Sequence, residues 1–345
     1  MTTQTGRVDA PDNRVKAAPD AGSNSAAPHS GGVSHASRIS AFMLRYATVI
    51  FAVCLLITTS IIYPRFWNID NLANILSQNA PIGIVAVGMT VVIVAGGFDL
   101  SAGAVYAAAG VVFASLANDL SLIAAFIGAL LIGAVAGLIN GFIATKLQVN
   151  SLIATIGTGA AFSGLTYLYC SSQPVVADVE GFDVLGLGRL HGVPWSALLL
   201  VAVFLVAGVT MNNTVFGRWI YAVGGNAEAA RVSGLRVGLI KLSAFVIVGV
   251  CAALAGLLSA SQLGVGQPTV GGSIALDAFT IVVIGGTSIY GGQGALWRTG
   301  VGLLIVSVMT NLFNAAALDT ATQLIAKGVI LVAALGLDAL SRART

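Results

Sequence analysis

Long apolar runs, separated by short polar segments, extend along most of the 345-residue chain. Runs of about 20 apolar residues are long enough to cross a bilayer as α-helices, and the alternating segments of about ten residues that build a transmembrane barrel do not occur in the sequence. We therefore expect an all-α polytopic membrane protein with about ten transmembrane helices, some of them broken by glycine. The runs lie near residues 46–63, 76–96, 102–118, 121–145, 151–170, 194–212, 241–262, 277–293, 299–317 and 321–340.

The first 41 residues differ from this pattern. They are rich in Ala, Ser, Gly, Pro and Asp and lack a periodic apolar pattern, so they cannot bury a core. No apolar segment opens them, as a signal peptide would require. We expect a disordered cytoplasmic tail over residues 1–41 and a transmembrane domain over 42–345. The longest cytoplasmic loop of that domain is expected at about 213–240.

Composition excludes several other classes. The chain is 57% hydrophobic and 8% charged, whereas a soluble domain has about 25% charged residues. A net charge of +3 without a basic stripe does not suit a nucleic-acid partner. Cys54, Cys170 and Cys251 are far apart, which indicates neither a metal site nor a disulfide framework. We expect no metal, no catalytic residue and no cofactor bound by this chain.

Basic residues predict the orientation of the chain. With the N-terminus in the cytoplasm, 13 of the 16 Lys and Arg residues fall in inner segments, Arg65 and Arg189 lie outside, and Lys327 lies within a span. Such asymmetry follows the positive-inside rule, and it predicts that both termini are cytoplasmic. The inner residues are Arg7, Arg14, Lys16, Arg38, Arg45, Lys146, Arg218, Arg231, Arg236, Lys241, Arg298, Arg342 and Arg344.

A charged stretch, GGNAEAARVSGL, lies within the predicted cytoplasmic loop at residues 224–235. Asn226 is a good N-cap, Glu228 and Arg231 suit the two ends of the helix dipole, and Gly234 can adopt the left-handed conformation that ends a helix. This short helix could contact a soluble partner, or it could merely connect two spans. The candidate contact residues are Gly224, Gly225, Asn226, Glu228, Ala229, Ala230, Arg231 and Gly234.

Two glycine-broken segments interrupt the apolar pattern, GGFDLSAG at 96–103 and GGTSIYGGQG at 285–294. Paired breaks of this kind mark the pathway of many transporters, because unwound backbone at membrane depth usually lines a cavity. Asp99 is either a functional intramembrane carboxylate or a solvated N-cap of the third span at the inner surface. The candidate pathway residues are Gly96, Gly97, Asp99, Ser101, Asn140, Gly285, Gly286, Asn311 and Asn314, of which the three asparagines could contact a hydroxylated solute. Gly133, Gly137 and Gly141 predict close helix packing.

From about residue 45 to 340 the chain resembles the permease subunits of ABC importers of the ribose/xylose-type branch, which carry monosaccharides and related solutes. The resemblance rests on GGFDLSAG (96–103), GLING (137–141), IATIGT (153–158), FGRWIYAVGGNAEAARVSGL (216–235), AALAGLL (252–258) and GGTSIYGGQGALWRTGVG (285–302). It implies that Glu228, Ala229, Ala230 and Gly234 belong to the coupling helix, which docks on the ATPase subunit.

The resemblance also implies the partners: an ABC ATPase subunit that binds ATP and Mg²⁺, a periplasmic solute-binding protein, and a second permease copy in the bacterial inner membrane. No Walker A loop occurs in this sequence, so the ATPase must be a separate chain and this subunit is not an enzyme. Two departures from the family pattern are Ala275, where a glutamate near the outer mouth is common, and Asn150-Ser151 in place of a proline pair.

Two other classes compete with this interpretation. An ion-gradient-driven secondary transporter of a small polar solute needs intramembrane acidic relays, for which Asp99 and Asp277 are the candidates. An intramembrane enzyme needs a catalytic constellation, and the spans contain no pattern of His with Asp or Glu, or of Ser with Lys. Both alternatives have less support in the residues than the importer.

Overall fold

A computed structural model describes residues 2, 35–326, 328–330 and 332. The chain divides into two compact units, residues 1–42 and 43–345. Helix α1 (His35–Ile62) begins within the predicted tail, at its seventh residue from the end, and the boundary at residue 41 stays a prediction. Apart from Thr2, the remainder of the predicted tail lies outside the described residues. All that follows concerns the unit 43–345.

Among the described residues, seven helices are long and apolar enough to cross a membrane, and the expected number of about ten stays a prediction. Two shorter apolar helices, Thr48–Ile62 within α1 and α11 (Ile274–Ile284), accompany them. The tenth expected span, 321–340, is helical where it is described, up to residue 332. The seven are α2 (Ile69–Val94), α3 (Ala102–Asp119), α4 (Leu122–Lys146), α5 (Ser151–Tyr169), α7 (Trp195–Asn213), α10 (Val237–Leu263) and α12 (Leu296–Ala315).

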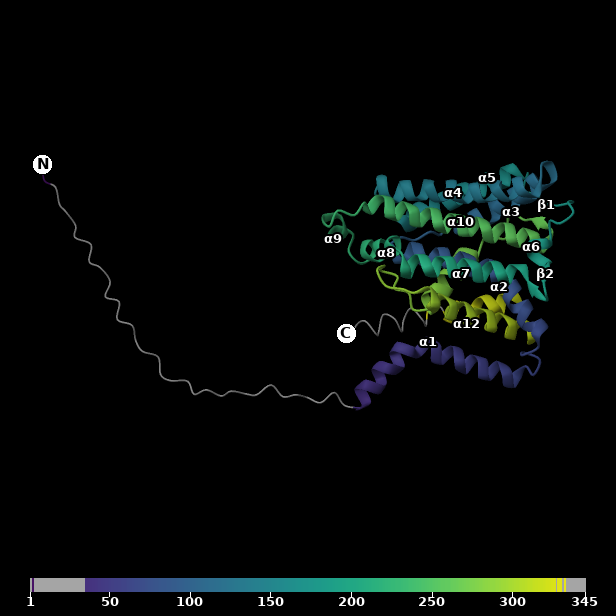
Figure 1. Cartoon of the computed structure of the whole chain (residues 1–345), viewed down its shortest axis with the longest axis horizontal. Helices are drawn as coiled ribbons and strands as arrows, with labels where there is room; N and C mark the ends of the chain where they lie inside the picture. Colours follow the sequence, from purple (N-terminus) through teal and green to yellow (C-terminus); the bar gives the residue numbers. More distant parts are fainter. Residues whose placement is uncertain (1, 3–34, 327, 331, 333–345) are drawn as a thin grey trace. The chain divides into compact units, whose positions relative to one another are not determined.

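Helix α10 lies at the centre of the bundle, where it packs against α2, α3 and α4 (Figure 1). Small residues allow this approach. A Cβ on Gly133 would lie 2.6 Å from the Cβ of Ala253, and one on Gly137 would lie 2.6 Å from the Cα of Val246. The expected small-residue face of α4 is therefore confirmed as a contact surface for α10.

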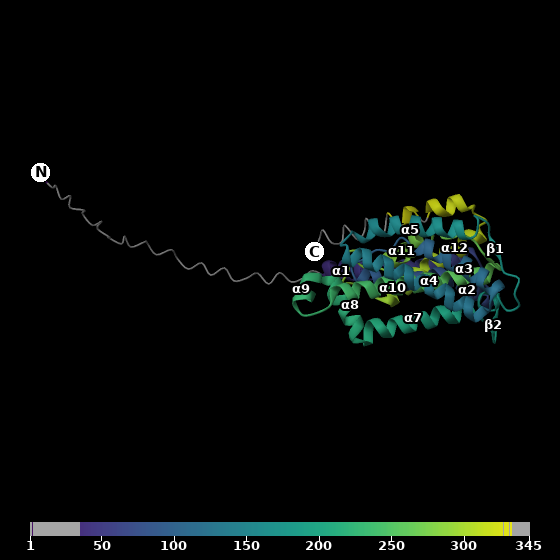
Figure 2. The ribbon, with the colours of Figure 1, turned by 90° about the horizontal axis from the view of Figure 1, so that it is seen from above.

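Short elements cover the two ends of this unit (Figures 1 and 2). At one end, β1 (Val175–Val176) pairs antiparallel with β4 (Val265–Gly266), and β2 (Arg189–Leu190) pairs with β3 (Val193–Pro194) beside α6 (Val184–Leu187). At the opposite end lie α8 (Val215–Gly225) and α9 (Ala227–Val232). The predicted inner loop and the predicted outer loop thus lie on opposite ends of the bundle.

The eighth apolar run is not a full helix. A span over 277–293 was expected, but α11 begins at Ile274 and ends at Ile284, and residues 285–295 form an irregular loop. Before α11, the chain follows α3 so closely that a Cβ on Gly266 would lie 2.7 Å from the Cα of Val111. The segments before and after α11, residues 264–273 and 285–295, are not helical.

The position of Ala275 corrects one expectation. Ala275 is 5% exposed, and its backbone nitrogen lies 3.6 Å from where a Cβ on Gly103 would be. The residue that replaces the family's glutamate is therefore buried in the contact between α3 and α11, and not at an open outer mouth.

Candidate functional site

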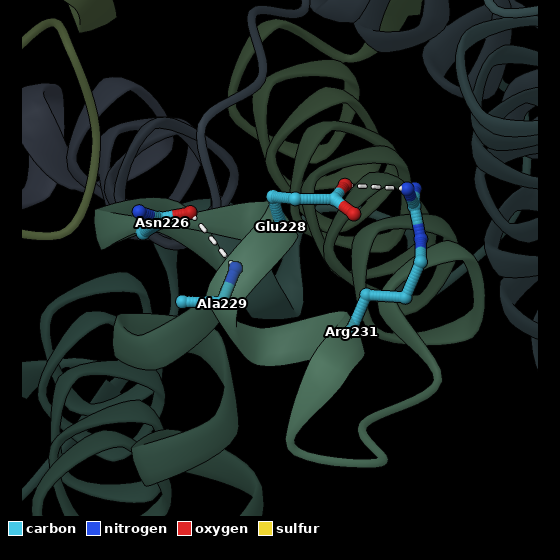
Figure 3. Close-up of polar contacts among 4 residues, drawn as sticks. All are labelled: Asn226, Glu228, Ala229 and Arg231. Atoms are coloured by element: carbon cyan, nitrogen blue, oxygen red, sulfur yellow. Dashed lines mark hydrogen bonds and ion pairs between the residues drawn. The ribbon is translucent and has the colours of Figure 1, made fainter.

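Helix α9 has the two caps that its sequence predicts, and Figure 3 shows the first of them, at Asn226. The side chain of Asn226 accepts a hydrogen bond from the backbone N–H of Ala229 at 2.9 Å. At the other end Gly234 has a φ of 84°, and the N–H groups of Gly234 and Leu235 donate to the carbonyls of Arg231 and Ala230 at 3.0 Å each. This pair of bonds is a Schellman motif, which ends a helix after six residues.

The charged side chains of α9 point into solvent. Arg231 and Glu228 form an ion pair at 2.7 Å, with 63% and 72% of their side chains exposed (Figure 3). Val232 is 82% exposed, whereas Ala230 is buried. An exposed ion pair contributes little to stability, so these residues are available for an external contact.

Helix α8 positions α9, and sequence reasoning did not predict it. The side chain of Thr214 caps α8 by accepting from the N–H of Gly217 at 3.2 Å. Gly217, Ile220 and Val223 are buried at helical spacing. That spacing, after a threonine, is the signal that could have identified the helix.

A second cluster surrounds Asp99, which lies between α2 and α3 and is 1% exposed. Its carboxylate accepts from the backbone N–H of Ser101 at 2.9 Å, from the Ser101 hydroxyl at 2.6 Å and from the Asn140 amide at 3.3 Å. Asp99 does contact the first turn of α3, as the capping alternative predicts. It is not solvated, however, so that part of the alternative is wrong.

Helices α4 and α5 hold the segment 96–101 in place. Asn140 donates to the Ser101 hydroxyl at 2.7 Å and accepts from Thr158 at 2.6 Å. The N–H groups of Phe98 and Leu100 donate to the hydroxyls of Ser151 and Thr155 at 3.0 and 3.1 Å. The sequence interpretation did not assign these α5 hydroxyls to the site. Their spacing of four and three residues, which places them on one helix face, is the available signal.

The other predicted pathway residues lie apart from this cluster. Gly285 packs against the backbone of Arg298, and Gly286 follows with a φ of 83°. Asn311 donates to Asn71 at 3.0 Å, and Asn314 accepts from Gln323 at 3.1 Å. Asn71, the partner of Asn311, lies in the first turn of α2, whereas Asp99, the partner of Asn140, follows the end of that helix at Val94. The helix between them is roughly 35 Å long. The three asparagines thus do not form one site within a single chain.

One cavity among the described residues, of about 330 Å³, does not suit a polar solute. It lies between α7, α2 and α10, and it is lined by apolar side chains except for Thr210, whose hydroxyl donates to the carbonyl of Val206 at 2.7 Å. A polar solute would lose its hydrogen bonds there without compensation.

Residues 71–335 match a family described as the permease component of branched-chain amino acid transport systems. Relatives include the ribose import permease protein RbsC of Haemophilus influenzae, 37% identical over 87% of this chain and 95% of that protein. RbsC of Bacillus subtilis is 39% identical over 82% and 89%, and the L-arabinose transport system permease protein AraH of Escherichia coli is 36% identical over 84% and 88%. No solved structure matches.

The chain therefore belongs to this family of transport permeases. It is the membrane-spanning subunit of an ABC importer and a multi-pass protein of the inner membrane. It is not an enzyme, because ATP hydrolysis belongs to a separate ATPase subunit. An ATPase and a solute-binding protein are accordingly its partners. The alternative of an ion-gradient-driven transporter is not supported.

Proposed function

We propose that this permease imports a monosaccharide, that two copies form the central path, and that both termini are cytoplasmic. We assign the solute class from the relatives of 36 to 39% identity, because their names specify the monosaccharides ribose and L-arabinose. A third, at 33% identity, is the D-allose transport system permease protein AlsC of Escherichia coli. All of these sugars are small, neutral and rich in hydroxyl groups.

We place the second copy against the exposed face of α5, because polar groups lie beside that face. Leu152, Ile153, Ile156, Leu165 and Leu168 are between 40% and 79% exposed, although Ala154, Thr155 and Thr166 of the same helix are buried. Thr158 of the same helix is half-buried, and its hydroxyl donates to the Asn140 side chain at 2.6 Å. A path between two such faces would have polar groups that the apolar cavity of the single chain lacks.

Helix α9 supports coupling to the ATPase. It is short, capped at both ends and exposed on its charged side, and a helix of this length is not stable alone. Docking of the ATPase on the exposed residues Glu228, Arg231, Gly225, Asn226, Ala229 and Gly234 would transmit ATP-driven closure to α8. Of the other two predicted contact residues, Ala230 is buried and Gly224 packs against the backbone of Val94, so these two support the helix from behind. This chain itself binds neither ATP nor Mg²⁺ in this proposal.

The experiment that tests the solute is a panel of pentoses and hexoses, titrated by calorimetry into the binding protein that assembles with this permease. We expect saturable binding of at least one monosaccharide, and ATP-dependent uptake of the same sugar by vesicles that contain the complete complex. Binding of branched-chain amino acids alone would overturn the sugar assignment. Uptake that persists without ATP and stops with an ionophore would overturn the importer.

A further inference from the structure

Glycines from three distant parts of the sequence meet at one point of the fold. They are Gly96 after α2, Gly224-Gly225 at the end of α8, and Gly291-Gly292 in the loop between α11 and α12. We call these five residues the glycine junction. The sequence indicates each of the three parts separately but gives no sign that they touch.

The contacts in the glycine junction are between backbones. The N–H of Gly292 donates to the carbonyl of Val94, the last residue of α2, at 2.9 Å. A Cβ on Gly224 would overlap that same carbonyl oxygen and would lie 2.7 Å from the nitrogen of Gly292. A Cβ on Gly291 would lie 2.9 Å from both the Cα of Gly96 and the carbonyl oxygen of Gly224. No side chain larger than hydrogen fits at Gly224 without a shift of the backbone.

Each of the three segments that meet in the glycine junction continues directly into an element with a proposed role in transport. Gly224 and Gly225 end α8, and α9 begins two residues later at Ala227. Gly96 and Gly97 begin the segment that contains Asp99. Gly291 and Gly292 lie in the loop that joins α11 to α12, and the Tyr221 hydroxyl of α8 donates to the carbonyl of Gly294 in that loop at 2.9 Å.

We propose that the glycine junction transmits the movement of α9 to the Asp99 segment and to the α11–α12 loop together. The proposal rests on the function proposed above, in which α9 docks on the ATPase. Backbone packed on backbone has no flexible side chain to absorb a displacement, and tightly packed contacts shift between discrete arrangements. A displacement of α8 therefore moves both broken segments, which are the elements least restrained by helical hydrogen bonds.

Hydrogen exchange on the complete importer tests the junction without any substitution. The reconstituted complex of permease, ATPase and binding protein is compared with and without a non-hydrolysable ATP analogue. We expect the protection of peptides covering 92–101 and 286–294 to change together with that of 224–234. A change confined to 224–234 overturns the glycine junction and leaves ATPase docking intact, whereas no change at 224–234 contradicts the proposed docking of α9.

Substitutions give an independent test. Gly224→Ala should increase the hydrogen-exchange rate of the Gly292 amide about tenfold, as expected for a hydrogen bond that opens locally. The variant should also lose solute-stimulated ATP hydrolysis. The ATPase should still copurify with it. Gly208→Ala in α7 is the matched control, because a Cβ there meets no atom within 4 Å, and it should resemble the wild type.

Tyr221→Phe removes one hydrogen bond and adds no bulk, so it covers the case in which Gly224→Ala does not accumulate in the membrane. We expect uptake per ATP hydrolysed to fall about two- to tenfold, the effect of one lost hydrogen bond. Full coupling in a Gly224→Ala protein that accumulates would overturn the proposal. Where Gly224→Ala does not accumulate, wild-type uptake and wild-type exchange at 286–294 in Tyr221→Phe would overturn it.

Discussion

Asp99 combines deep burial with hydrogen bonds to three donor groups. Burying a carboxylate costs free energy unless hydrogen bonds or charges compensate it, and here the compensation comes from Ser101 and Asn140. Among the described residues no lysine or arginine forms an ion pair with it. The carboxylate therefore fixes the segment 96–101 against α4, and we infer that it supports the pathway wall without lining it in the single chain.

Asp99→Asn tests this role at the residue scale. Asparagine has almost the same size and keeps an acceptor for Ser101, so membrane abundance should stay close to the wild type. The charge-assisted bonds weaken by about 1–2 kcal/mol, and uptake should fall about tenfold because 1.4 kcal/mol corresponds to a factor of ten. Quantitative immunoblotting and sugar uptake in the same cells measure the two effects.

Asp119→Asn is the control for Asp99→Asn, because Asp119 is exposed at the end of α3. It should change neither quantity. If Asp99→Asn retains wild-type uptake at wild-type abundance, the carboxylate serves only as a cap for α3.

At the scale of elements, α9 has six residues and few buried contacts, so its caps determine its direction. Gly234→Pro blocks the left-handed closing conformation, because the φ of proline is fixed near −65°. Glu228→Ala removes a charge that stabilises the helix by about 0.3–1 kcal/mol, too little to unfold the bundle. Both variants should lose uptake and solute-stimulated ATP hydrolysis together in reconstituted vesicles, while the binding protein still binds its sugar.

Glu180→Ala is the control, because Glu180 is an exposed glutamate outside the inner loop. This variant should keep both uptake and solute-stimulated ATP hydrolysis. If α9 only connected two spans, Gly234→Pro and Glu228→Ala would both keep full activity. That result would contradict the assignment of α9 as the coupling helix.

The sequence predicts those elements of the fold that depend on local interactions. The caps at Asn226 and Gly234 are correct because capping involves residues within one turn. Sequence reasoning extended the eighth span to residue 293, although the glycines of 285–294 indicate a break and α11 ends at Ile284. The loop that follows is held by long-range contacts, such as the bond from the Gly292 N–H to the Val94 carbonyl, which local pattern cannot show. For the same reason Asp99, Ser101 and Asn140 were assigned to one site, but the bond from Thr158 of α5 to Asn140 was not foreseen. Asn311 and Asn314 were placed with residues that lie far from them.

At the scale of the whole molecule, the charges of the unit 43–345 are segregated. Lys146 ends α4, and Arg218, Arg231 and Arg236 lie on or beside α8 and α9. Lys241 lies near Gly96, and Arg298 lies near Gly286 at the start of α12. Arg189 lies in the opposite end of the bundle, where it pairs with Asp70 at 3.8 Å. The positive-inside rule then predicts that the α8–α9 end faces the cytoplasm.

Cysteine labelling in intact cells tests this orientation. The starting variant lacks Cys54, Cys170 and Cys251, and single cysteines are introduced near His29 and at Asp178, whose side chain is exposed in the loop 171–193. We expect an impermeant maleimide to label position 178 in intact cells and to label the site near His29 only after permeabilisation. Because translocation of the many basic residues at the α8–α9 end would oppose the positive-inside rule, a mixed orientation is not expected. Labelling near His29 in intact cells, with position 178 protected, would invert the topology and place α9 on the side of the membrane without ATP, where it could not dock on an ATPase.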